Sequence, residues 1–278
     1  MLHGLSLLAL VPLLSQPIAA SQDEPPPDGS KLVKMTLYAD RDGVQPGQTF
    51  TLGIHYRITP RWHIYWVNPG DSGLPVKAEI TAPPGFEVGA LRYPWPKRQE
   101  DPGDIVSFIH DGEVMLLADV KAPADLKPGA EIKIEADGKW LVCTDICVAG
   151  QGHASVALTA AAAPKPANEK LFASWRDKLP KPWSDLTGTR ALWSGDEAAP
   201  KLKIVVPGAT ALEFFPYASP TIKMSARKVD IGKQGGTIAI EWAFERKKPE
   251  DKPLARGVLW VKTAQGEASY LFDGAFAK

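Results

Sequence analysis

Hydrophobic and polar positions alternate along much of this chain, and the clearest run lies at residues 50–58. Hydrophobic side chains fill its even positions, while polar residues and glycine, His55 among them, fill the odd positions. Because successive side chains of a strand point to opposite faces, this period of two predicts a strand with one buried face and one solvated face that carries His55. Similar runs predict strands at residues 114–120, 131–136 and 154–159.

Glycine and proline separate these runs at regular intervals. Turn signals of this kind occur at residues 46–47, 83–85, 101–104 and 127–129. Short strands separated by such turns are typical of an antiparallel β-sandwich. The first half of the chain is therefore predicted to form one sandwich domain.

The pattern changes between residues 160 and 182. A stretch rich in alanine and proline at residues 160–167 predicts a linker, and Asn168 is suited to cap a helix over residues 168–178. Pro180 and Pro182 end that helix, because proline cannot continue its hydrogen bonding. Strand patterns then resume at residues 202–206, 212–215, 221–227, 237–244, 257–263 and 269–272.

These patterns predict an all-β protein, with two β-sandwich domains joined by a linker and one short helix. The predicted boundaries are 1–20 for a signal peptide, 21–30 for a disordered lead-in, 31–160 for the first domain, 161–190 for the linker and helix, and 191–278 for the second domain. The second domain contains no cysteine and no histidine, so we expect it to serve as a docking or spacer module.

The N-terminal residues have the layout of a secretory signal peptide. An apolar stretch at residues 5–14 precedes small residues at 19–20, and a polar segment follows from Ser21. The stretch is shorter than the roughly 20 residues that a membrane-spanning helix needs, and no later segment approaches that length. We therefore expect an exported protein whose mature chain starts near Ser21 and does not span a membrane.

Charge and motif content argue against several classes of protein. Lys and Arg together number 32, as do Asp and Glu, and no extended basic block occurs, so nucleic acid is not an expected partner. The sequence also lacks the Ser/His/Asp order, the phosphate-binding glycine loop and the HExxH pattern of common hydrolases and nucleotide enzymes. No cofactor is expected from these residues.

Candidate chemistry is concentrated in the two cysteines of the chain, Cys143 and Cys147. They lie just after one predicted strand and before another, so a tight connection that folds back would bring them within bonding distance. A disulfide across so short a loop adds little stability, since loop-closure stabilisation grows with loop size. In an exported protein without other cysteines, this bridge is a candidate for thiol–disulfide exchange, which would make the protein a thiol:disulfide oxidoreductase.

Two other interpretations of the pair stay open. An inert bridge would be a structural clip, and the protein would then be a non-catalytic adaptor. Alternatively, Cys143 and Cys147 in the reduced state, with a third ligand such as His63 or His153, would bind Cu(I) in a copper-binding or copper-tolerance protein. Asp145 lies between the cysteines and disfavours a thiolate, so neither cysteine is expected to be a strongly activated nucleophile.

Three blocks of the sequence resemble one known family. They are residues 61–75, which include Asn-Pro-Gly-Asp-Ser-Gly at 68–73, residues 93–98, and residues 140–147. In their order and spacing these blocks are similar to the periplasmic N-terminal region of the DsbD/ScsB thiol:disulfide reductases, over residues 31–160. The helix and the second β-domain resemble the ScsB arrangement more loosely. The resemblance implies an immunoglobulin-like first domain and a location in the periplasm.

The resemblance also implies a route for electrons. In this family the cysteine pair accepts electrons from a membrane donor and passes them to thioredoxin-like oxidoreductases of the periplasm. Cys147 would be the cysteine bonded to the partner, and Cys143 would resolve the mixed disulfide. The sequence ends at Lys278, ahead of the membrane-embedded and C-terminal thioredoxin-like domains of the family, so a separate membrane protein is expected to supply the electrons.

The family further implies a cap over the cysteines. The matching stretch is residues 97–110, with Phe108 as a shielding side chain. His63 and Tyr65 correspond to aromatic residues on the strand beside the pair. Trp140, close to Cys143 in the sequence, is a further candidate for shielding it.

Overall fold

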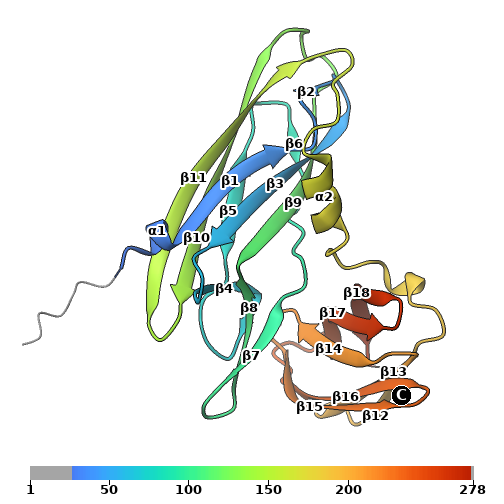
Figure 1. Cartoon of the computed structure of the whole chain (residues 1–278). Coiled ribbons are helices and arrows are strands. Elements are labelled where there is room, and N and C mark those ends of the chain that lie inside the picture. Colours follow the sequence, from blue (N-terminus) through green and yellow to red (C-terminus); the bar gives the residue numbers. More distant parts are fainter. Residues whose placement is uncertain (1–26, 277–278) are drawn as a thin grey trace, which may run out of the picture.

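Figure 1 shows the computed structural model of the chain, which describes residues 27–276. The predicted signal peptide at 1–20 lies outside the described residues, as does most of the lead-in predicted at 21–30. The end of that lead-in is helical and not irregular, because helix α1 (Gly29–Leu32) begins there. Gly29 has no side chain and lies directly against the backbone of Ala149, which anchors α1 on the first domain.

The first domain is built from eleven strands. They are β1 (Val33–Ala39), β2 (Gly43–Val44), β3 (Thr49–Ile58), β4 (His63–Gly70), β5 (Lys77–Thr81), β6 (Glu87–Val88), β7 (Lys97–Asp101), β8 (Ile105–Asp111), β9 (Glu113–Lys121), β10 (Glu131–Cys143) and β11 (Cys147–Ala160). One sheet has the order β1-β3-β9-β6, and the other has the order β2-β11-β10-β4-β8-β7, with β5 paired to β10. Buried residues of both sheets, such as Ile54 of β3 and Ile134 of β10, meet in one core between them.

The second domain repeats this plan with fewer strands. They are β12 (Arg190–Gly195), β13 (Pro200–Pro207), β14 (Ala211–Pro216), β15 (Ile222–Gly232), β16 (Gly235–Phe244), β17 (Leu254–Thr263) and β18 (Gly266–Ala275). The sheets β12-β13-β16-β15 and β14-β17-β18 enclose a separate core that contains Phe214, Ile240 and Phe272. The prediction of an all-β protein with two sandwich domains is confirmed.

Helix α2 (Glu169–Arg176) corresponds to the helix predicted at 168–178, but its role differs from that of a linker. Its buried residues, Phe172 and Trp175, belong to the core of the first domain. Asn168 stands at the N-cap without making the predicted capping bond; its side-chain amide instead donates to the carbonyl of Ala39. A second short helix, η1 (Trp183–Asp185), leads into the second domain, and no helix among residues 27–276 is long and apolar enough to cross a membrane.

The position of α2 explains why the prediction for His55 is wrong. Only 1% of the surface of His55 is exposed, although it lies on the face of β3 that the sequence pattern assigns to solvent. The ring of Trp175 covers His55, with ring centroids 6.2 Å apart, and His55 Nε2 lies 3.0 Å from Glu113 Oε2. A pattern of alternation cannot reveal that a helix more than a hundred residues later in the sequence folds back onto the second face of the sheet.

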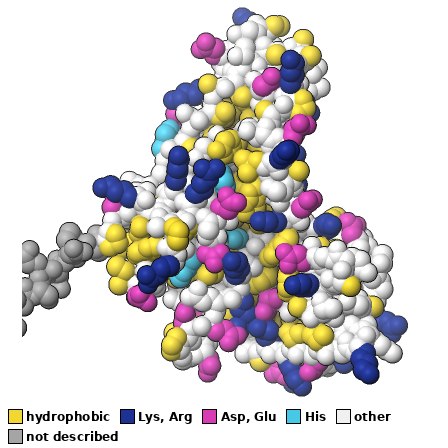
Figure 2. All heavy atoms as spheres, viewed as in Figure 1, with side chains coloured by type: hydrophobic (Ala, Val, Ile, Leu, Met, Phe, Trp, Pro, Cys, Tyr) yellow, Lys and Arg dark blue, Asp and Glu magenta, His cyan; other side chains and the backbone are white. Residues whose placement is uncertain are grey.

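The two domains touch through a small aromatic cluster, which we call the interdomain cluster: Trp66, Phe108, Phe215 and Val258. Figure 1 shows the second domain lying beside the end of the first domain that carries β7 and β8. On the face shown in Figure 2, basic and acidic side chains are interspersed over both domains, without a large block of either sign. This distribution agrees with the equal totals of basic and acidic residues in the sequence.

Candidate functional site

The β10–β11 hairpin positions the two cysteines opposite each other. Its antiparallel register pairs Cys143, the last residue of β10, with Cys147, the first residue of β11. Three residues make the turn between them, and the N–H of Thr144 donates to the carbonyl of Ile146 at 3.0 Å. The Cα atoms of the cysteines are 4.2 Å apart, and the two side chains form a disulfide.

The two sulfur-bearing residues differ in their exposure. Cys143 is only 1% exposed, because β4 pairs with β10 at this point and places His63 opposite Cys143. Cys147 is exposed, since β11 has no partner strand on its outer side there; β2 pairs only with the far end of β11, at Thr159. Cys147 is therefore the more exposed member of the pair.

Tyr65 forms the wall behind the buried cysteine. Its hydroxyl donates a hydrogen bond to Cys143 Sγ at 3.3 Å. Ile109 of β8 lies opposite Tyr65 in the strand pairing, and Cys143, Tyr65 and Ile109 form one buried cluster. The ring of His63 packs edge-on against Tyr65, with ring centroids 5.2 Å apart. The structure thus brings Tyr65 and His63 to the pair, at the positions that the family resemblance implied.

Burial favours the uncharged form of both aromatic neighbours. It lowers the pKa of His63, an effect that the nearby Asp101 and Asp111 oppose. It raises the pKa of Tyr65, and Asp101 raises it further. The hydroxyl of Tyr65 therefore keeps its proton and remains a hydrogen-bond donor toward the sulfur.

The Asn-Pro-Gly-Asp-Ser-Gly segment at residues 68–73 supports Tyr65 from the other side. Gly73 has a φ of +85°, and a Cβ there would lie 2.2 Å from the Tyr65 ring. Only glycine combines this backbone conformation with so close an approach. Leu74 follows with 61% of its surface exposed, and Pro75 forms an isolated bridge with Tyr65. This segment therefore seats the residue that contacts Cys143.

Two of the predicted shielding residues do not shield the pair. Residues 97–110 form the β7–β8 hairpin, and in β8 it is Ile109 that faces Cys143, while Phe108 points to the opposite side, into the interdomain cluster. Trp140 lies on the core face of β10 and packs edge-on against Tyr56, whereas Cys143, an odd number of residues later, faces away from that core. Strand alternation is the reason in both cases.

Ile109 and Gly73 are the contacts that sequence reasoning missed. Alternation over residues 105–111 would have distinguished Ile109 from Phe108 once the strand was assigned, but the strand was interpreted as a capping loop. The family blocks included Gly73, yet nothing in its identity alone indicates that it supports a tyrosine ring.

The candidate copper ligands lie at different distances from the cysteines. His63 is directly opposite Cys143, but His153 pairs with Asp137, six residues along β11 from Cys147, which corresponds to about 20 Å of strand. Among residues 27–276, no group of three or more His, Cys, Asp or Glu side chains is arranged to hold a metal ion. The copper interpretation stays an untested prediction.

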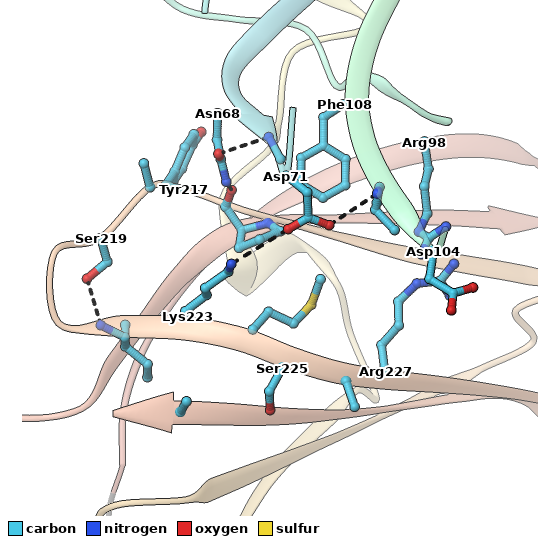
Figure 3. A pocket seen from close by; sticks show the side chains of 18 residues that line it. Asn68, Asp71, Arg98, Asp104, Phe108, Tyr217, Ser219, Lys223, Ser225 and Arg227 are labelled. Carbon is cyan, nitrogen blue, oxygen red and sulfur yellow. Dashed lines mark hydrogen bonds and ion pairs between the residues drawn. The ribbon is translucent and has the colours of Figure 1, made fainter. Parts of the chain in front are cut away.

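A cavity of about 550 Å³ lies between the domains (Figure 3), and its lining contains neither cysteine. Its lining combines residues of the first domain, such as Asn68 and Asp71, with residues of β15, such as Lys223 and Arg227. Asp71 Oδ1 lies 3.7 Å from Lys223 Nζ, and the Asn68 side-chain amide donates to the carbonyl of Pro216 at 2.7 Å. The segment that seats Tyr65 is therefore also in contact with the second domain.

Comparisons with known proteins bear on both domains. Residues 36–159 match the family described as thiol:disulfide interchange protein DsbD, N-terminal. The chain is also similar to the N-terminal periplasmic domain of ScsB from Proteus mirabilis, with 11% sequence identity and a TM-score of 0.62, covering 87% of this chain and 93% of that chain. The reduced N-terminal domain of DsbD from Neisseria meningitidis also matches, with 12% identity and a TM-score of 0.30, covering 50% of this chain and 94% of that chain. A search of curated proteins found no significant match.

The similarity to the ScsB domain shows that the arrangement of two sandwiches recurs in another protein. The family match is more specific, because it spans the first sandwich and includes Cys143, Cys147, His63 and Tyr65. Residues 36–159, which make up most of the first domain, therefore match the DsbD N-terminal family of thiol:disulfide interchange proteins.

Proposed function

We propose that this protein exchanges thiols and disulfides in the periplasm, passing electron pairs from a membrane donor to thioredoxin-like oxidoreductases through Cys143 and Cys147. One observation carries the proposal. The pair joins an exposed sulfur-bearing residue, Cys147, to a buried one, Cys143, whose Sγ accepts a hydrogen bond from Tyr65. Such an asymmetric pair offers a site of attack and a stabilised leaving group, which an inert clip does not need.

Reduction of the protein follows from this geometry. A thiolate of the donor attacks Cys147 Sγ, a new S–S bond forms, and the bond between Cys147 and Cys143 breaks with its electron pair passing to Cys143 Sγ. The hydroxyl of Tyr65, 3.3 Å away, stabilises the developing thiolate, which then takes up a proton. The second thiolate of the donor then attacks the donor sulfur that is bonded to Cys147. The bond to Cys147 breaks, Cys147 is released as a thiolate, and the donor leaves with an internal disulfide.

Transfer to an oxidised partner runs in the opposite direction. The Cys147 thiolate attacks the disulfide of the partner and forms the mixed disulfide. Cys143 then loses its proton and attacks Cys147 Sγ, which restores the intramolecular bridge and releases the partner as a dithiol. Both directions therefore pass through an intermediate in which Cys147 carries the partner.

The surface around Cys147 supports docking of a partner protein. Ile146, in the turn between the cysteines, is 49% exposed, and Leu74 is exposed next to the Gly73 that seats Tyr65. An exposed aliphatic side chain next to a reactive sulfur, as Ile146 is, is suited to the transient contact that an exchange reaction requires.

Two measurements test the proposal. The reduction potential of the pair, from equilibration with glutathione buffers, is expected between about −270 and −120 mV, the range of exchange proteins, whereas a value below about −300 mV would mark a structural bridge. Mixed with an oxidised thioredoxin-like protein, the Cys143→Ala variant is expected to accumulate a mixed disulfide on Cys147. If only Cys147→Ala retained the partner, the assigned roles of the two cysteines would be wrong.

A further inference from the structure

Strands β4 and β8 each present neighbouring residues to the two sides of the same sheet. On one side, Tyr65 and Ile109 contact Cys143. On the other side, the residue adjacent to each of these, Trp66 after Tyr65 and Phe108 before Ile109, packs into the interdomain cluster. The residues behind Cys143 and the residues that pack against the second domain therefore lie on opposite faces of the same two strands.

Aromatic rings of the second domain pack against this face of β4 and β8. Phe215 packs edge-on against Phe108 with centroids 5.4 Å apart, and against Trp66 at 6.2 Å. Tyr217 stacks on Trp66 at 5.2 Å, with an angle of 22° between the rings. Trp66 has no exposed surface, and the cluster around it combines residues of both domains. Most of its aromatic contacts come from the second domain.

The pairing of β4 with β8 is irregular where these contacts occur. Tyr65 pairs with Ile109 and Gly70 pairs with Ser107, so residues 66–69 of β4 stand opposite a single residue, Phe108. Regular sheet hydrogen bonds therefore do not hold this part of β4 against β8. Within this part of β4, the Asn68 amide donates to the carbonyl of Pro216 in the second domain (Figure 3). Asp71, just after β4, lies near Lys223 and also hydrogen-bonds to Val106 of β8.

We propose that Phe215 of the second domain is a positioning residue for the exchange reaction. By packing on Trp66 and Phe108, it keeps the adjacent Tyr65 and Ile109 in place against Cys143, so that the Tyr65 hydroxyl meets the sulfur that leaves as a thiolate. The second domain is thus part of the machinery that sets the rate at Cys147, and not only a spacer. This inference rests on the proposed exchange reaction at the pair, but it does not depend on which partner reacts.

The test measures how fast a small dithiol, dithiothreitol, reduces the disulfide of the full chain. Phe215→Leu keeps an apolar side chain but loses the edge contacts with Trp66 and Phe108, and it is expected to slow reduction about fivefold; Phe215→Ala is expected to slow it more. Phe214→Leu is the matched control. Phe214 is the preceding residue of β14, and its ring faces Trp242 in the core of the second domain, so this variant is expected to keep the rate of the original chain.

A double-mutant cycle shows whether the effect acts through Tyr65. In a Tyr65→Phe background, Phe215→Leu is expected to have no further effect, because the hydroxyl that it misplaces is already absent. The proposal is overturned if both Phe215 variants react at the original rate, if Phe214→Leu slows reduction equally, or if the Phe215→Leu effect persists undiminished in that background. A low reduction potential or a failure to trap a thioredoxin-like partner would instead contradict the proposed function, and this cycle would still report on the coupling.

Discussion

At the scale of single residues, the hydroxyl of Tyr65 is the polar group that touches the buried sulfur. A hydrogen bond to a charged acceptor contributes about 1.5 to 3 kcal/mol, and the acceptor here becomes charged only as the disulfide opens. We therefore predict that Tyr65→Phe slows reduction of the disulfide by dithiothreitol about tenfold, because the leaving thiolate of Cys143 loses its donor. Stopped-flow or thiol-trapping kinetics would measure this rate.

A matched control is available in the same domain. The hydroxyl of Tyr56 is buried and has no hydrogen-bond partner among the described residues. Tyr56→Phe therefore removes an equivalent atom from the core without touching the cysteines, and the reduction rate is expected to stay unchanged. Equal rates for the two variants would show that the Tyr65 hydroxyl does not assist the leaving group.

His110 provides a second prediction at this scale. Burial lowers the pKa of His110 to about 3; Asp111 opposes the shift, and Lys97 and Lys178 add to it. The unfolded chain, with a histidine pKa near 6.5, binds a proton that the folded chain does not bind between these two values. The part of the free energy of unfolding that depends on neutral His110 is therefore fully present above pH 6.5 and is lost as the pH falls toward 3.

The substitution His110→Leu should remove this pH dependence. Between pH 6.5 and pH 4, the free energy of unfolding of the original chain is expected to fall by about 1.4 kcal/mol per pH unit more steeply than that of the variant. Urea unfolding at several pH values measures both slopes, and the comparison holds whatever the variant costs in absolute stability. Parallel slopes would contradict the buried neutral state of His110.

At the scale of elements, the segment at residues 68–73 supports Tyr65 through a close contact between Gly73 and the tyrosine ring. In Gly73→Ala, the new methyl group would collide with the Tyr65 ring, since a Cβ there lies 2.2 Å from it. Gly103 is the matched control, because its φ of +91° imposes similar backbone strain while a Cβ would meet nothing within 4 Å. Backbone strain is expected to cost both variants about 1 kcal/mol of stability, and the collision is expected to cost Gly73→Ala more; only Gly73→Ala is expected to slow reduction of the disulfide. Unchanged kinetics in Gly73→Ala would separate this segment from the reaction.

Much of the element pattern could be predicted from the sequence, because strand alternation is a local property. Residues 50–58 and 237–244 were placed in strands for this reason, and β3 and β16 confirm them. The location of α2 was not predictable in the same way. Its sequence shows an apolar face around Phe172 and Trp175, but not which surface that face covers.

Helix α2 gives a prediction of its own. Because Trp175 covers His55 and closes the outer face of β3, Trp175→Ala is expected to destabilise the first domain by about 3 to 5 kcal/mol. Lys170→Ala, on the exposed side of the same helix, should change stability by less than about 0.5 kcal/mol. Thermal unfolding followed by circular dichroism would distinguish the two. Similar melting temperatures would mean that α2 contributes little to the stability of the first domain.

At the scale of the whole molecule, the sequence indicated two domains but not the surface that joins them. Phe215 lies in the strand predicted at residues 212–215, but nothing in the sequence assigns Trp66 or Phe215 to a surface between two domains. Their contact depends on the relative placement of two independently patterned sandwiches, which no periodicity encodes. The same limit applies to the cysteine site: the family resemblance placed His63 and Tyr65 beside the pair, but the face to which Phe108 points required the strand register.

An ionic network also crosses this interface. Glu213 Oε2 of β14 lies 2.9 Å from Arg227 Nη2 of β15 and 3.9 Å from Arg98 Nε of β7. Burial raises the pKa of Glu213 against the pull of Arg227 and Arg98, and burial together with the charge of Arg227 lowers the pKa of Arg98. The carboxylate therefore separates two partly desolvated cations that would otherwise repel each other across the domain boundary.

Neutralising this carboxylate should loosen the junction. Removing one partner of a largely buried ionic group costs about 3 kcal/mol or more, so Glu213→Gln is expected to weaken docking of the second domain and to increase the radius of gyration in small-angle scattering. Glu241→Gln, which removes an exposed carboxylate paired with Lys201 on the same domain, is the control and should leave the scattering curve unchanged. If the second domain positions Tyr65, Glu213→Gln should also slow reduction of the disulfide, because the domain acts on the sulfur only while it is docked. An expanded molecule that reacts at the original rate would separate docking from reactivity.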